Sequence, residues 1–98
     1  KNINLIKGSI PDTLNQVREN FFSPDFLHID MNNPYPERKA FEFFYPKMKS
    51  GSVIIFDDYS FVGNSYNEQR KTIDDYCFNQ RISKPLGLPT GQGILIKF

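Results

Sequence analysis

Strand-like and helix-like stretches alternate along this chain of 98 residues, and that alternation restricts its fold more than any other feature of the sequence. Short apolar runs typical of strands occupy residues 3–6, 25–30 and 52–57. Apolar side chains at helical spacing follow each of these runs. A strand followed by a helix, repeated three times, predicts a parallel sheet flanked by helices and therefore an α/β fold.

The predicted helices begin with residues that are common at helix N-termini. They cover residues 11–22, with Asp12 or Thr13 as N-cap and Gln16 as capping-box partner, residues 36–48, with Pro36 in the first turn, and residues 65–80, with Ser65 and Glu68 at capping-box spacing. Pro46 should kink or end the second helix. The apolar stripe of that helix is expected to pack in the core and consists of Ala40, Phe41, Phe44, Tyr45 and Met48.

The third apolar run and the C-terminal tail predict the centre and one edge of the sheet. Residues 52–57 form the most apolar run, as expected for a central strand that is covered on both faces. Residues 83–98 hold two short strand-like stretches around a Pro-Thr-Gly-Gln-Gly turn, which predicts a hairpin whose second strand runs antiparallel. Because these glycines precede a strand and not a helix, hairpin geometry explains them better than phosphate binding does.

Composition excludes several classes of partner. The chain has 12 Lys+Arg against 11 Asp+Glu, a net charge of +1, and no long block of either sign, so neither nucleic acid nor a membrane surface is an expected partner. No apolar run approaches the roughly 20 residues that span a bilayer. The single cysteine, Cys77, cannot form an internal disulfide, and its place on a helix stripe predicts a buried, inert thiol. We therefore expect one small cytoplasmic domain.

Three carboxylates follow the predicted parallel strands. Asp30 ends the second strand, and Asp57 and Asp58 end the third. The carboxyl ends of such strands lie at one edge of the sheet, where α/β proteins bind ligands. Oxygen ligands gathered there would suit a hard divalent cation such as Mg²⁺. For any one aspartate, the alternative interpretation is that it caps the following loop.

The remaining polar candidates carry less weight. His28 lies on the same predicted strand face as Asp30, but a lone strand histidine is more often a core or surface residue, so we leave it out of the site. Asp74 and Asp75 lie on the polar flank of a predicted helix, where we interpret both as solvated.

Four segments together resemble the C-terminal half of class I S-adenosylmethionine-dependent methyltransferases. They are KGSIPDTL (7–14), LHIDMN (27–32), YPKMKSGSVIIFDDY (45–59) and LPTGQGILIK (88–97). Within that class they look most like the macrocin-type sugar O-methyltransferases, metal-dependent enzymes related to catechol O-methyltransferase. The resemblance implies a partial Rossmann-like methyltransferase fold, S-adenosylmethionine as cofactor and a small-molecule hydroxyl acceptor.

The resemblance also implies roles for particular residues. Asp30, Asp57 and Asp58 match the positions that bind Mg²⁺ or a similar divalent cation in that family. By position, the turn with Ser9, Ile10 and Asp12 would approach the adenine of the cofactor, so these three residues are the candidates for cofactor binding.

The sequence departs from the family pattern at two places. The sugar enzymes have a catalytic Asp two residues after the first metal ligand, and the catechol enzymes a Lys three residues after it, where this chain has Asn32 and Asn33. Neither amide can act as a general base, so the catalytic residue is unknown. The glycine-rich loop and the ribose-binding acid have no counterpart, so we expect residues 1–98 to be the C-terminal part of a methyltransferase domain that alone is inactive and tends to form homo-oligomers.

Two other functions remain open at this point. A non-catalytic binding or assembly domain with the same fold is plausible because of the two asparagines. A receiver-type, Mg²⁺-binding phosphoryl-transfer domain also has a strand that ends in an acidic pair. Receiver domains, however, have that pair after their first strand, and here the pair follows the third predicted strand.

Overall fold

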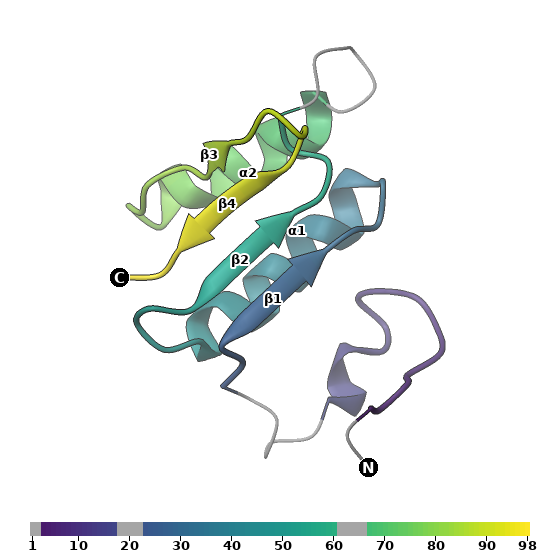
Figure 1. The fold of residues 1–98 in the computed structure, drawn as a ribbon. Coiled ribbons are helices and arrows are strands. Elements are labelled where there is room, and N and C mark those ends of the chain that lie inside the picture. Colours follow the sequence, from purple (N-terminus) through teal and green to yellow (C-terminus); the bar gives the residue numbers. More distant parts are fainter. Residues whose placement is uncertain (1–2, 18–22, 61–66) are drawn as a thin grey trace.

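The structure, a computed structural model, describes residues 3–17, 23–60 and 67–98. Its strands are Phe26–Ile29 (β1), Val53–Phe56 (β2), Leu86–Gly87 (β3) and Gly93–Ile96 (β4). They form one sheet in the order β1-β2-β4-β3 (Figure 1). β1 and β2 are parallel, whereas β4 runs antiparallel to both β2 and β3. The predicted α/β fold, with β2 inside the sheet and a C-terminal hairpin, is confirmed.

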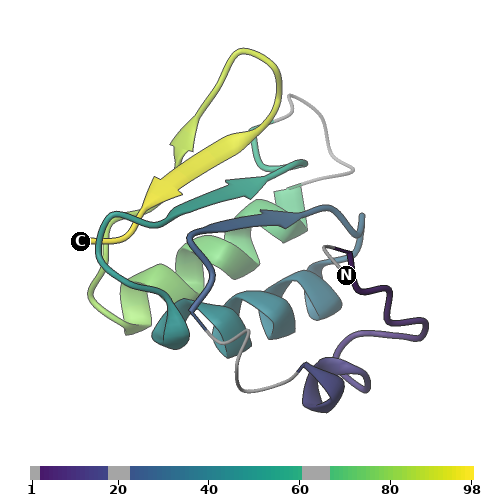
Figure 2. The ribbon, with the colours of Figure 1, turned by 60° about the horizontal axis from the view of Figure 1, so that its bottom comes forward.

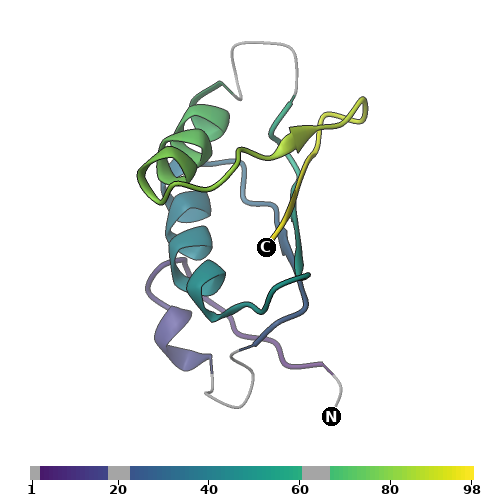
Figure 3. The same cartoon turned by 90° about the vertical axis from the view of Figure 1, so that its left-hand side faces the viewer.

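Two helices, Pro34–Phe44 (α1) and Asn67–Asn79 (α2), cover the same face of the sheet (Figures 2 and 3). Ile54 and Phe56 of β2 are buried beneath this face, but Val53 and Ile55 are only half-buried. The expectation that β2 is covered on both faces is therefore wrong for this structure. The reason is that both helices pack on the same face of the sheet (Figures 2 and 3). None of the helices that the structure describes is long and apolar enough to cross a membrane.

The start of the chain differs from its prediction. Residues 3–6 form no strand, and Leu5 is 92% exposed. A strand exists only where its backbone groups pair with a neighbour, and no described segment pairs with residues 3–6. In place of the first predicted helix there is one 3₁₀ turn, Leu14–Gln16 (η1), after which Val17 is extended. The rest of that predicted helix, residues 18–22, lies outside the described residues.

The predicted capping box of η1 is also wrong. Thr13 Oγ1 donates to the carbonyl oxygen of Ser9 at 3.0 Å and caps no N–H group of η1. The same carbonyl accepts the backbone N–H of Thr13 at 2.9 Å. Thr13 therefore closes the turn that begins at Ser9, because its hydroxyl and its amide bind the same backbone oxygen.

Both long helices are close to their predicted bounds. α1 begins two residues early because Asn33 caps it, its side chain accepting the N–H of Tyr35 at 3.2 Å. As predicted, the helix ends near Pro46, which lies in the 3₁₀ turn Tyr45–Lys47 (η3). α2 begins near its predicted start, although Ser65 lies outside the described residues.

Phe41 joins the two helices to the sheet. Its side chain is fully buried, and its ring makes edge-on contacts with two other rings. The distance between ring centroids is 5.1 Å to Phe56 of β2 and 4.8 Å to Tyr76 of α2. Cys77 is buried in the same core, as predicted, and burial raises the pKa of its thiol to about 11, which fits the expected inert thiol.

Replacing Phe41 with Ala should lower the free energy of unfolding by about 3–5 kcal/mol, because the cavity adjoins three elements at once. Denaturant titration followed by circular dichroism measures this loss. The matched control is Phe78→Ala on α2. The Phe78 side chain is 82% exposed, so its removal should lower the free energy of unfolding only slightly. Equal losses for the two variants would contradict the central role of Phe41.

Candidate functional site

The parallel pairing of β1 with β2 brings two of the predicted ligands together. Ile29 is paired with Phe56, and the N–H of Asp57 donates to the carbonyl oxygen of Ile29 at 2.9 Å. Asp30 and Asp57 therefore leave adjacent strands at the same edge. Together with His28 they form a group whose ligand atoms all lie within 4.8 Å of one another. His28, which was not predicted as a ligand, thus lies beside two of the three predicted ligands.

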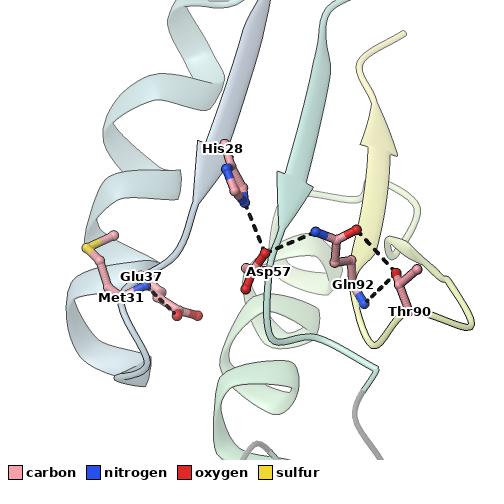
Figure 4. Close-up of polar contacts among 6 residues, drawn as sticks. All are labelled: His28, Met31, Glu37, Asp57, Thr90 and Gln92. Carbon is pink, nitrogen blue, oxygen red and sulfur yellow. Dashed lines mark hydrogen bonds and ion pairs between the residues drawn. The ribbon is translucent and has the colours of Figure 1, made fainter.

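Asp57 is the most strongly hydrogen-bonded member of the group (Figure 4). Its Oδ1 accepts the side-chain amide of Gln92 at 3.0 Å and lies 3.2 Å from Nε2 of His28. The Gln92 hydrogen bond is the largest cause that lowers the pKa of Asp57, and the His28 contact lowers it further against the effect of desolvation. Asp57 is therefore ionised at neutral pH. His28 can either bind a cation through an unprotonated nitrogen or donate to Asp57.

Asp58 occupies a different environment from Asp57. It is only 6% exposed, and its Oδ2 has no hydrogen-bond partner among the described residues. Burial raises the pKa of Asp58, and the negative charges of Asp57 and Asp30 raise it further. Asp58 is thus electrostatically coupled to the other two aspartates, but it is not a member of the group with His28.

Glu37 is a buried acid that sequence reasoning missed. Its side chain is 2% exposed, and its Oε2 accepts the N–H of Met31 at 3.2 Å (Figure 4). Burial is the main cause that raises the pKa of Glu37 to about 7, with backbone hydrogen bonds from Met31 and Asn32 acting in the opposite direction. Glu37 therefore holds the turn after Asp30 against α1. Only its helix position next to a polar turn could have indicated this role.

The residues after Asp58 attach this edge of the sheet to α2 and the hairpin. Tyr59 is buried, and its hydroxyl donates to Asp74 Oδ1 at 2.5 Å. Asp75 is exposed and paired with Lys71 at 3.2 Å. The interpretation of both α2 aspartates as solvated is therefore wrong for Asp74, because the buried hydroxyl of Tyr59 needs an acceptor.

Ser9 and Ile10, two of the predicted cofactor-binding residues, line a hollow of about 450 Å³. Met31 and Asn33 also line it, so the hollow adjoins the turn that follows Asp30. Asp12 is exposed and does not line it. The structure thus brings Ser9 and Ile10 next to the acidic edge and leaves Asp12 outside.

This fold and this site define a class of protein, the Rossmann-like α/β domains with an acidic site at the carboxyl ends of their parallel strands. Residues 1–59 match the model of a family described as a methyltransferase domain, and the chain belongs to that family. None of the curated proteins compared with the chain matches it. The sheet, its crossover helices and its C-terminal hairpin thus form part of a Rossmann-like methyltransferase fold.

The raised pKa of Glu37 predicts a pH dependence of stability. The native state binds this proton more tightly than an ordinary glutamate, whose reference pKa is 4.5, so the contribution of Glu37 to stability falls as pH rises from 4.5 to about 7. Glu37→Gln removes this dependence and should gain stability relative to wild type across that range. Denaturant titrations at pH 5 and pH 8 with chelator present measure the difference.

Glu68→Gln, an exposed change on α2, is the control and should show no such gain. A constant difference between wild type and Glu37→Gln at both pH values would contradict the assignment of the titration to Glu37.

Proposed function

We propose that this chain serves an S-adenosylmethionine-dependent O-methyltransferase that acts on a hydroxyl of a sugar or another small molecule, with a divalent cation such as Mg²⁺. Methyl transfer follows from the family to which the chain belongs. The observation that carries the cation is the convergence of Asp30 and Asp57 with His28 within 4.8 Å. The resemblance to macrocin-type enzymes supports a sugar as acceptor.

The donor set fits a cation. Asp30 and Asp57 would hold it, with Asp58 as the third predicted carboxylate, whose buried Oδ2 lacks a partner among the described atoms. An unsatisfied buried carboxylate oxygen is costly unless a proton or a cation compensates it. His28 would add a nitrogen ligand that Mn²⁺ accepts more readily than Mg²⁺. A bound cation would orient an acceptor hydroxyl and lower its pKa.

The cofactor would lie beside this site. Ser9 and Ile10 line the hollow that adjoins the turn after Asp30, and Tyr35, which is 59% exposed, adds an aromatic side chain to the lining. These residues suit a planar base such as adenine, and Asp12 would take part only from outside the hollow. Bound S-adenosylmethionine would supply the methyl group to the acceptor hydroxyl.

The two asparagines that replace a base have structural roles. Asn32 adopts a left-handed conformation with φ 54°, which asparagine tolerates, and Asn33 caps α1. Glu37 is too deeply buried to reach an acceptor. The acceptor proton must therefore leave to water or to a residue outside this set. The lack of a base at positions 32 and 33 also favours the second candidate, a non-catalytic domain with the same fold, whereas the family match argues against a receiver domain.

Mn²⁺ should raise the melting temperature of the protein, because a ligand that binds only the folded state stabilises that state. At a Mn²⁺ concentration of roughly 100 times Kd, the free energy of unfolding rises by about 2.7 kcal/mol. Asp57→Asn should remove most of this shift. Asp75→Asn makes the same chemical change at an exposed position of α2, and this variant should keep the shift in melting temperature. Differential scanning fluorimetry measures all three proteins. No shift in wild type would reject the cation site.

Methylation of a panel of sugars and catechols by the full-length protein, measured with isotopically labelled S-adenosylmethionine, should depend on the cation and stop when chelator is added. Asn32→Ala should cost far less than the roughly 10²-fold loss expected when a general base is removed. Methylation that resists chelator would reject the metal-assisted reaction. The absence of methylation across the whole panel would favour the non-catalytic domain.

A further inference from the structure

The side chain of Gln92 connects the hairpin to the candidate cation site. It lies in the turn between β3 and β4, and its Nε2 donates to Asp57 Oδ1 at 3.0 Å. His28 Nε2 lies 3.2 Å from the same oxygen, on the opposite side of Asp57 (Figure 4). The Asp57 carboxylate is therefore flanked by nitrogen atoms from two other segments, and both contacts are made by one of its oxygens.

Thr90 fixes the orientation of the Gln92 amide. The backbone N–H of Gln92 donates to Thr90 Oγ1 at 3.4 Å, and the Thr90 hydroxyl donates its own proton to Gln92 Oε1 at 3.2 Å. With Oε1 occupied by this hydroxyl, the Nε2 group of Gln92 is directed to Asp57, as Figure 4 shows. The turn thus presents a donor, and not an acceptor, to the carboxylate.

Groups other than this side chain also hold the hairpin in place. Gly91 O accepts the N–H groups of Tyr59 and Ser60 at 3.0 and 2.8 Å, so backbone atoms join the hairpin to the segment after β2. Ser60 Oγ also binds backbone oxygens, those of Leu88 and Gln92, at 2.9 Å. The amide of Gln92 therefore has Asp57 and Thr90 as its partners while other groups hold the hairpin.

We propose that Gln92 is a positioning residue for the cation site, because it holds Oδ1 of Asp57 and so fixes the carboxylate at the edge shared with Asp30 and His28. This inference rests on the proposed function, since it concerns the same site. Hydrogen-bond donors to a ligating carboxylate typically change metal affinity by about 10- to 100-fold. Gln92 would act through Asp57 and would not touch the cation.

The test measures binding of Mn²⁺ alone, with free ion counted by electron paramagnetic resonance, and the melting temperature of each protein in chelator. Gln92→Met keeps the length of the side chain but removes the donor, so Mn²⁺ should bind about 10-fold or more weakly with an unchanged melting temperature in chelator. Thr90→Val leaves the Gln92 amide in place without its orienting hydroxyl, and a smaller loss of affinity is expected.

Gln80→Met, at an exposed position in the turn directly after α2, is the matched control and should change neither the Mn²⁺ affinity nor the melting temperature. If wild type binds Mn²⁺ and Gln92→Met binds it equally well, the positioning role is overturned while the cation site stands. A loss of affinity matched by a large fall in melting temperature would mean that Gln92 is structural, which also overturns the proposal. If wild type binds no Mn²⁺, the cation site fails and this inference with it.

Discussion

The parallel pairing of β1 with β2 is the constraint on which the site depends. In this register Ile29 lies beside Phe56, so the next residues of both strands, Asp30 and Asp57, must emerge side by side. Phe41 packs against Phe56 from below and keeps α1 under the pair. The core therefore determines where the carboxylates lie, and their mutual repulsion must be compensated by the groups around them.

The structure compensates the repulsion differently at each acid. Asp57 remains near solvent and receives hydrogen bonds, which favour its charged form. Asp58 and Glu37 are buried, and burial favours their protonated forms. Asp57 and Asp58 are adjacent in the turn after β2, yet their pKa values shift in opposite directions, because Asp57 accepts hydrogen bonds near solvent and Asp58 is buried. A carboxylate that stays ionised beside Asp30 is the kind of ligand that a hard cation needs.

Sequence periodicity was sufficient for elements whose packing partners are among the described residues. The strands β1 and β2, both long helices and the hairpin were predicted because apolar spacing reports burial directly. Residues 3–6 have an equally strand-like pattern but form no strand, since pairing is not a local property. The site shows the same limit. Asp30 and Asp57 could be predicted from strand ends, but Gln92 lies 35 residues from Asp57, and only the folded hairpin brings the two together.

The glycines of the hairpin acquire their explanation from the same edge of the sheet. Gly91 has φ 95°, which the turn requires, but Gly93 lies in a strand, where a Cβ atom would lie 2.5 Å from the ring of Tyr59. At Gly87 a Cβ atom would lie 2.9 Å from that of Ser60. The hairpin must therefore lack side chains at two points so that its backbone can approach the segment directly after Asp57 and Asp58. That close approach is also what brings Gln92 within hydrogen-bonding distance of Asp57, so the glycines serve the carboxylate edge and not a phosphate.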